Sequence, residues 1–315
     1  MRENFTIYHP LINLLYFLAV LVLSVVVMNP VFLGISLICA FIYGVYLKGA
    51  TAARFGSVMT LSLIFLSITF NALLNYRGAT ALFPLPFDLG PVTFESIMYG
   101  LTTGLMIGSV IMWFVSFNVI ISSDKLTFLF GRLLPSSSLI FIMVLRFIPR
   151  YREQIKKISE AQQTIGMGID KGTLRTKIKN GSRILSIMFT WALENAIQTA
   201  DSMKSRGYGI RNRTSFRFYK FTLADRILMI VIIVFTFITA AVFALGFIRA
   251  EFYPFFEIGI NGDLSAEIGR QGSLFVSILG YVSFSALSLI PVWLGLKERI
   301  YWSRTKDHNT REAAA

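Results

Sequence analysis

Residues 96–121 read Ser96-Ile-Met-Tyr-Gly-Leu-Thr-Thr-Gly-Leu-Met-Ile-Gly-Ser-Val-Ile-Met-Trp-Phe-Val-Ser-Phe-Asn-Val-Ile-Ile121, and this run contains no Asp, Glu, Lys, Arg or His. A helix of about 20 apolar residues crosses the hydrocarbon core of a bilayer. The run therefore predicts a membrane-spanning helix. Gly100, Gly104 and Gly108 recur along it at four-residue spacing, which permits the close approach of another helix. We expect this glycine face to pack within the same helix bundle rather than against a partner protein.

Five other apolar runs of the same kind lie on either side of residues 96–121. They are Leu11–Met28, Pro30–Leu47, Ser57–Asn75, Ile227–Ile248 and Ser273–Leu296. The chain of 315 residues is 55% apolar and only 15% charged, whereas an ordinary soluble domain is about a quarter charged. The sequence predicts an all-α, polytopic membrane protein with about six transmembrane helices and long amphipathic cytoplasmic helices between the fourth span and the fifth.

The segment Ser122–Lys220 between these two spans is strongly basic. It holds 18 of the 30 Lys and Arg residues but only 6 of the 17 Asp and Glu residues. Because basic residues accumulate in cytoplasmic loops, we place this segment and both chain termini in the cytoplasm. The chain then divides into residues 1–121 with four spans, the cytoplasmic region 122–220, residues 221–300 with two spans, and a tail, 301–315. The net charge of +13 follows from this topology and does not indicate binding to nucleic acid.

The cytoplasmic region begins with a predicted long helix from Leu139 to about Ile165. Pro149 should kink this helix, because proline cannot donate a backbone hydrogen bond and its ring clashes with the preceding turn. Arg146 stands three residues before the proline. We expect it to bond the carbonyls freed by the kink or to pair with Glu153.

A second long helix is predicted for Thr173–Ser205. Arg206 follows it, where a cation interacts favourably with the helix dipole, and Gly207 is a natural residue for the turn after a helix end. Apolar residues recur along this helix at steps of three and four positions, which is the helical period: Ile184, Leu185, Met188, Trp191, Ala192, Ala196, Ala200 and Met203.

Residues that would indicate catalysis or cofactor binding are missing from the sequence. It has no phosphate-binding Gly-x-x-x-x-Gly-Lys-Ser/Thr loop, and its single cysteine, Cys39, and two histidines, His9 and His308, give no metal-binding cluster. We therefore predict no catalytic residue, no cofactor and no metal site. A secondary transporter is disfavoured because the spans carry no ionisable residue, and a membrane-embedded enzyme is disfavoured because the acidic residues are scattered.

The stretch Asp201-Ser-Met-Lys-Ser-Arg-Gly-Tyr-Gly209 stands at the end of the second predicted helix. It resembles the Ala/Ser-Arg-Gly signature of the transmembrane T component (the EcfT or CbiQ family) of energy-coupling-factor transporters. Other stretches similar to the family precede it in the same order: His9–Asn13, Ser123–Lys125, Gly131–Pro135, Leu145–Arg150 and Glu160–Gln163. The resemblance covers most of the chain.

This resemblance implies a subunit without catalytic activity in an ATP-driven importer of a micronutrient, either a vitamin or a metal ion, in a bacterial or archaeal cell membrane. Its implied partners are two ABC-type ATPase subunits or one fused pair, and a small membrane protein, the S component, which binds the substrate. The resemblance also implies that the ATPases bind the two long cytoplasmic helices at their ends. Membrane lipid surrounds the spans.

The residues at the two helix ends are the candidate ATPase-docking site. At the second helix they are Ser205, Arg206 and Gly207, and at the first helix they are Thr164, Ile165 and Gly166. The family usually has arginine before the glycine at both ends, so Ile165 departs from the pattern. We expect the contact at Ile165 to be less ionic than the contact at Arg206.

Overall fold

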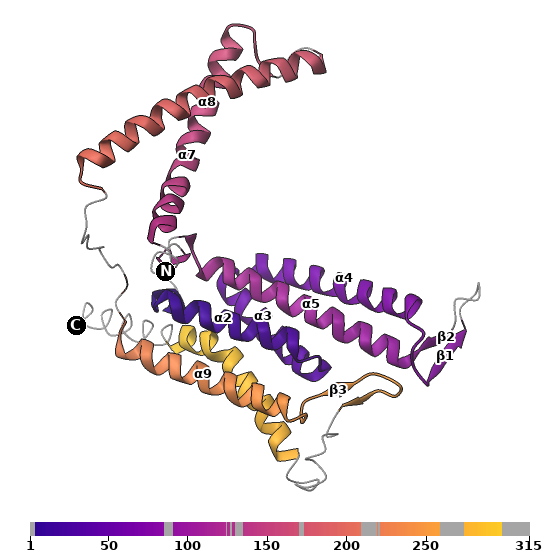
Figure 1. Cartoon of the computed structure of the whole chain (residues 1–315). Helices are drawn as coiled ribbons and strands as arrows, with labels where there is room; N and C mark the ends of the chain where they lie inside the picture. The colour runs from indigo at the N-terminus through magenta and orange to yellow at the C-terminus, as the bar shows by residue number, and fades with distance from the viewer. Residues whose placement is uncertain are drawn as a thin grey trace, which may run out of the picture. The chain divides into compact units, whose positions relative to one another are not determined.

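The computed structural model describes residues 4–84, 91–123, 125–126, 128–129, 135–169, 173–208, 219, 221–258 and 274–297. The chain forms two compact units (Figure 1). Met1–Leu126 and Tyr219–Ala315 make up the first, and Thr127–Phe218 makes up the second. The predicted tail, residues 301–315, lies outside the described residues.

The first unit consists mainly of apolar helices. They are α1 (Asn4–Ile7), α2 (Pro10–Val26), α3 (Pro30–Lys48), α4 (Ala50–Leu74), α5 (Phe94–Ile120), α9 (Leu223–Ala244) and a last helix, Leu274–Lys297. Five of the described helices are long and apolar enough to cross a membrane: α3, α4 from Ala53, α5, α9 and the last one. The predicted all-α, polytopic fold is confirmed.

The first predicted span, Leu11–Met28, is shorter as a helix than expected. Helix α2 has 17 residues, at the lower end of the lengths that cross a bilayer. It stops because Asn29 caps the next helix: the Asn29 side-chain oxygen accepts hydrogen bonds from the backbone N–H groups of Val31 (3.0 Å) and Phe32 (3.3 Å). Pro30 at the first position of α3 suits a helix start, where its missing N–H costs nothing.

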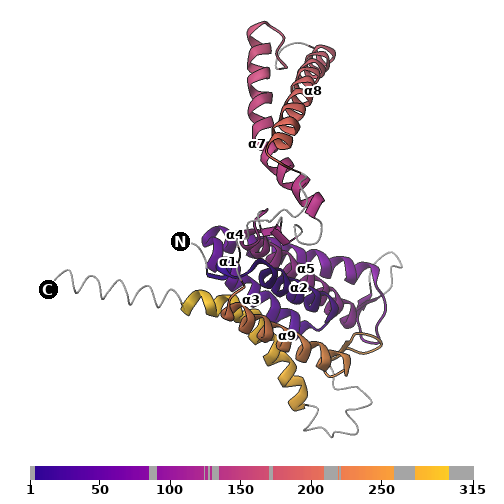
Figure 2. The same ribbon diagram turned by 60° about the vertical axis from the view of Figure 1, so that its left-hand side comes forward.

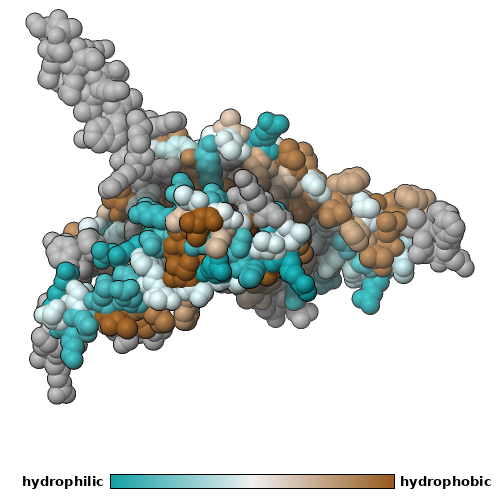
Figure 3. Space-filling view, turned by 90° about the horizontal axis from the view of Figure 1, so that it is seen from above, coloured by the Kyte–Doolittle hydropathy of each residue, from teal (hydrophilic) through white to brown (hydrophobic). Residues whose placement is uncertain are grey.

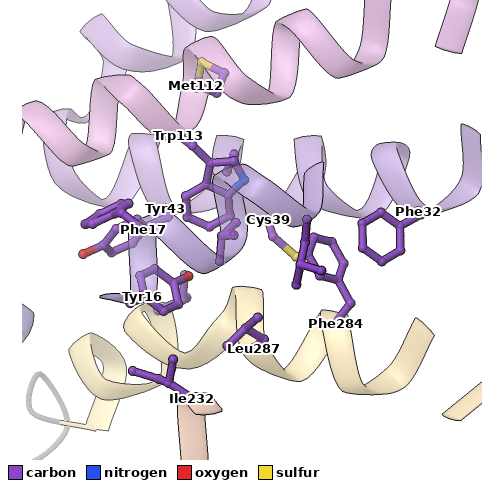
Figure 4. Close-up of a cluster of buried hydrophobic side chains, with 14 of the residues drawn as sticks. Tyr16, Phe17, Phe32, Cys39, Tyr43, Met112, Trp113, Ile232, Phe284 and Leu287 are labelled. Carbon is purple, nitrogen blue, oxygen red and sulfur yellow. The ribbon is translucent and has the colours of Figure 1, made fainter. Parts of the chain in front are cut away.

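Aromatic side chains form the core of the first unit. Trp113 of α5 is fully buried and meets Phe17 and Tyr16 of α2 edge to face, with ring centroids 6.3 and 6.1 Å apart. Its indole N–H donates to the Ser36 hydroxyl of α3 at 3.1 Å. Figure 4 shows this indole pointing from α5 into the cluster that also holds Tyr43 and Phe17. A tryptophan whose N–H has a partner is a specific joint between three helices.

The glycine face of α5 packs against α4, which runs beside it (Figure 1). A Cβ atom built on Gly104 would lie 2.7 Å from the Ile64 Cα, and one on Gly100 would lie 2.8 Å from the Ile68 Cα. The two backbones are therefore in direct contact, and the predicted packing of this face within the bundle is confirmed.

Two short hairpins, which the sequence analysis did not predict, join helices at one end of the unit. Strand β1 (Ala81–Pro84) pairs antiparallel with β2 (Pro91–Thr93), and β3 (Ala250–Glu251) pairs antiparallel with β4 (Glu257–Ile258). The connections contact each other, because the Ala79 N–H donates to the Pro254 carbonyl at 3.0 Å and the Asn75 amide donates to the Tyr253 hydroxyl at 2.5 Å.

At the start of α9, Asp225 joins two helices that are distant in sequence. Its carboxylate accepts from the backbone N–H of Thr222 (2.8 Å), from the Thr222 hydroxyl (2.7 Å) and from the backbone N–H of His9 (3.0 Å). Thr222 is the N-cap of α9, and His9 is the N-cap of α2. One carboxylate therefore binds the N-termini of both helices, where the helix dipoles favour a negative charge.

Lys125, just after α5, is a buried ammonium group. Its side chain is 2% exposed, and its Nζ has no hydrogen-bond partner among the described residues. Burial disfavours the charged form and lowers the pKa of Lys125 from 10.5 to about 8.

This pKa predicts a pH dependence of stability. Between pH 8 and 10.5 the unfolded chain binds a proton that the folded chain has lost, so the free energy of unfolding should rise with pH by up to about 1.4 kcal/mol per pH unit. Lys125→Met should flatten this rise. Thermal unfolding of both proteins in detergent across that pH range measures the difference, and parallel curves would contradict the expected titration.

Candidate functional site

The second unit contains two long helices, α7 (Pro135–Thr164) and α8 (Leu174–Ser205), which correspond to the two predicted cytoplasmic helices. Helix α7 starts four residues before the predicted Leu139, at a proline, which is well suited to the first helical position. Ile158 of α7 packs against Ile184 and Met188 of α8. Tyr151 and Trp191 extend this contact, with their rings edge to face and centroids 5.5 Å apart.

Pro149 lies inside α7, and Figure 2 shows this helix changing direction along its length. Arg146 is exposed, and no ion pair or hydrogen bond joins it to Glu153 within the described helix. Neither of the two contacts expected of Arg146, with Glu153 or with a carbonyl freed at the kink, is present within the described helix. Instead Arg150 lies over the ring of Trp191, 5.7 Å from its centroid, so the cation next to the proline stabilises the contact between α7 and α8.

The end of α7 is a Schellman turn. The Met167 N–H donates to the Gln162 carbonyl at 2.8 Å, and the Gly166 N–H donates to the Gln163 carbonyl at 3.0 Å. Gly166 has φ +78°. This left-handed backbone conformation is unfavourable for residues that have a Cβ atom. These bonds satisfy carbonyls that the helix end would otherwise leave free.

The end of α8 is the same turn with other residues. The Tyr208 N–H donates to the Met203 carbonyl at 3.1 Å, the Gly207 N–H donates to the Lys204 carbonyl at 3.1 Å, and Gly207 has φ +75°. Arg206 lies between the last residue of α8 and Gly207. Ile165 lies in the same way between the last residue of α7 and Gly166. The structure therefore places Ile165 at the position equivalent to Arg206.

Both residues before the glycines are exposed, and they differ in chemistry. The Ile165 side chain is 61% exposed. Arg206 is also exposed and has Lys204 in the same last turn, whereas the last turn of α7 has no basic residue. The tip of α8 (residues 205–208) is thus cationic, and the tip of α7 (residues 164–167) is apolar.

The hydroxyl groups of both tips bond to their own helices. Thr164 donates to the Glu160 carbonyl at 3.0 Å, and Ser205 donates to the Ser202 carbonyl at 3.0 Å. A Cβ built on Gly166 would meet no atom within 4 Å, so space is open beside the backbone. The α7 tip therefore presents Ile165 and Met167 outward beside the open backbone of Gly166, and the α8 tip presents Arg206 and Tyr208.

An exposed apolar row on α8 was missed by the sequence analysis. Leu185 belongs to the periodic apolar pattern of the sequence, but its side chain is 68% exposed. It belongs instead to a row at four-residue steps that is exposed along the helix: Leu185, Phe189, Leu193 and Ile197. Figure 3 shows hydrophobic residues exposed beside hydrophilic ones on the face that it presents. The four-residue spacing of these large residues in the sequence could have indicated that they share one face of the helix. The same spacing is found on buried faces, so it did not indicate exposure.

Comparison with known proteins assigns the sequence to a family. The sequence matches the CbiQ family model, described as cobalt transport protein, over residues 7–216, a range that includes both helix tips. The chain is 30% identical to the energy-coupling factor transporter transmembrane protein EcfT of Staphylococcus aureus over 199 aligned residues. These residues cover 59% of this chain and 70% of that protein.

Two further relatives carry the same name. EcfT of Lactococcus lactis is 38% identical over 93 residues, which cover 29% of this chain and 35% of that protein. EcfT 1 of Listeria monocytogenes is 28% identical over 165 residues, which cover 48% of this chain and 61% of that protein. The matched parts span less than two thirds of these two relatives.

Proposed function

Since the chain belongs to the CbiQ family of transport proteins, which includes relatives named EcfT, we propose that it couples cassette ATPases to a substrate-binding S component in an energy-coupling-factor importer. The observation that carries this proposal is the pair of long helices, α7 and α8, which end in the same exposed glycine turn. We call them the coupling helices. Each tip docks on one ATPase, either a separate subunit or one half of a fused pair.

The tip of α8 binds its ATPase through charge. The guanidinium of Arg206 can donate two parallel hydrogen bonds to one carboxylate, a geometry that lysine cannot reproduce. Lys204 adds a second positive charge in the same turn. These features call for an acidic groove on the ATPase, and the left-handed Gly207 lets the backbone approach the wall of that groove closely.

The tip of α7 binds by apolar contact. Ile165 occupies the position of the arginine and is largely exposed, so burying it on docking removes apolar surface from water. Full burial of an isoleucine contributes about 1.5–3 kcal/mol. The two ATPase contacts of this protein therefore differ in chemistry and in sensitivity to salt, because only the ionic contact is screened.

The first unit holds the S component in the membrane, and both chain termini face the cytoplasm with the coupling helices. The strongly basic segment Ser122–Lys220 supports this orientation. The S component determines which vitamin or metal ion is carried. The exposed row Leu185–Phe189–Leu193–Ile197 supports a further contact with an apolar partner surface.

Reconstitution of the chain with candidate ATPases and S component tests the proposal. The purified chain alone should hydrolyse no ATP, whereas the complex should hydrolyse ATP and accumulate substrate in vesicles. Transport of substrate by the chain alone, driven by an ion gradient, would instead support a secondary transporter. Turnover of a lipid by the chain alone would support a membrane-embedded enzyme.

Gly207→Val should weaken docking at the α8 tip. A β-branched residue at φ +75° is strained by at least about 1–2 kcal/mol, so the turn should open and Arg206 should lose its position. We expect affinity for the ATPase to fall at least about tenfold, since 1.4 kcal/mol is a factor of ten. Binding to the isolated ATPase measures this, with Gly34→Val in α3 as control, because a Cβ at Gly34 meets no atom within 4 Å and Gly34 lies outside both docking tips. Equal affinities of the two variants would contradict the prediction.

A further inference from the structure

Asp225 is a buried carboxylate to which the function proposed above assigns no role. It is 3% exposed and lies in the first turn of α9. Its three acceptor contacts go to Thr222 and to the backbone N–H of His9, which is 216 residues away in the sequence. We call Asp225, Thr222 and His9 the N-terminal clasp, because they join the N-termini of α9 and α2.

The clasp has a second layer, formed by the chain that enters α9. The His9 ring lies edge to face against Phe221, with centroids 5.3 Å apart, and against Tyr219 at 6.4 Å. The His9 Nδ1 accepts from the backbone N–H of Leu11 at 3.3 Å, which caps α2. His9 therefore touches both the helix that it caps and the residues that lead into α9.

The chemistry of the clasp requires a carboxylate. Oδ1 accepts from His9 and Oδ2 accepts from Thr222, so both oxygens face N–H or O–H donors. An asparagine amide offers one acceptor oxygen and two N–H donors. It would satisfy one helix N-terminus and set a donor against a donor at the other, and a buried donor without a partner is costly.

The position of the clasp along the chain connects it to the coupling helices. Helix α9, which begins at Leu223, is the first described helix of the membrane unit after α8 along the chain. The Asp225 carboxylate ties the start of α9 to the start of α2 through these hydrogen bonds.

We propose that Asp225 is a positioning residue that locks α9 to α2, so that a displacement arriving from the α8 tip moves both membrane helices together. This proposal rests on the proposed function of the chain. Loss of the clasp should leave ATPase docking intact, because the docking tips are unchanged, and should reduce the amount of substrate carried per ATP hydrolysed.

The experiment uses the complete complex, with ATPases and S component, reconstituted in vesicles. Asp225→Asn and the milder Thr222→Val, which removes one hydroxyl from the clasp, are compared with Thr222→Ser, which keeps it. Glu251→Gln, an exposed carboxylate in β3, serves as the matched control. We measure the yield of complex, the rate of ATP hydrolysis and the rate of uptake.

We expect Asp225→Asn and Thr222→Val to lower the uptake per ATP by about fivefold or more, the lower range of typical coupling energies, with normal yield and hydrolysis. Thr222→Ser and Glu251→Gln should behave as the unaltered protein does. A normal uptake per ATP, or a parallel loss of yield, hydrolysis and uptake in both clasp variants, would overturn the proposal. If the unaltered chain forms no complex with an ATPase, the proposed function itself fails.

Discussion

Arg206→Glu should abolish ATP-driven uptake while leaving the protein folded and inserted in the membrane. The substitution sets a negative charge against the acidic groove that the proposed docking requires. Truncation of one partner of a buried, hydrogen-bonded charge pair costs about 2–5 kcal/mol, and reversal of the charge adds repulsion. We therefore expect the affinity for the ATPase to fall by about 30-fold or more. Fold stability should not change, because Arg206 is exposed.

Three variants separate charge, shape and position at this site. Arg206→Lys keeps the charge but loses the planar fork, and should fall between the unaltered protein and Arg206→Glu. Arg152→Glu makes the same charge reversal at an exposed position of α7, away from both tips, and should leave docking unchanged. Ile165→Arg should be tolerated, because it restores the usual family residue at the other tip. Normal uptake by Arg206→Glu would refute the proposed contact.

Local signals in the sequence were enough to predict both helix tips. Gly166 and Gly207 follow long periodic helices, and glycine is the residue that closes a helix in the left-handed conformation. The structural equivalence of Ile165 and Arg206 also follows from their spacing to these glycines. Docking at the tips stays a prediction, because it depends on surfaces that belong to other proteins.

Contacts between distant segments could not be predicted in the same way. Nothing near His9 indicates that its backbone N–H donates to Asp225, since the pairing depends on how α2 and α9 pack. Arg146 was predicted, from local spacing alone, to bond carbonyls freed at the kink or to pair with Glu153. Arg150 lies over Trp191 instead, because Tyr151 and Trp191 bring α7 and α8 together at that level.

Periodicity also failed to distinguish a buried face from an exposed one on α8. Ile184 and Leu185 are neighbours in the same apolar pattern, yet Ile184 is buried against α7 and Leu185 faces outward. The pattern shows which residues share a face. It does not show how wide a face the neighbouring helix covers.

Gly104→Leu should separate α4 from α5 and strongly destabilise the membrane unit. The new Cβ would lie 2.7 Å from the Ile64 Cα, a backbone atom that cannot rotate away, so the helices themselves must move apart. Overpacking of a well-packed contact typically costs about 1–3 kcal/mol, and we expect the upper end of this range. The loss is serious for α4, because only 6% of its span is buried inside the protein and its glycine contact with α5 supplies much of its packing.

A graded series makes this test specific. Gly108→Ala should cost less than Gly104→Ala, because the Cβ at Gly108 meets the Thr60 Cγ2 at 2.9 Å, and a side-chain methyl group can shift more easily than backbone. Gly34→Leu in α3 adds the same side chain where no atom lies within 4 Å, and should leave the melting temperature in detergent nearly unchanged. If Gly104→Leu melts at the same temperature as Gly34→Leu, the backbone contact between α4 and α5 does not hold the bundle together.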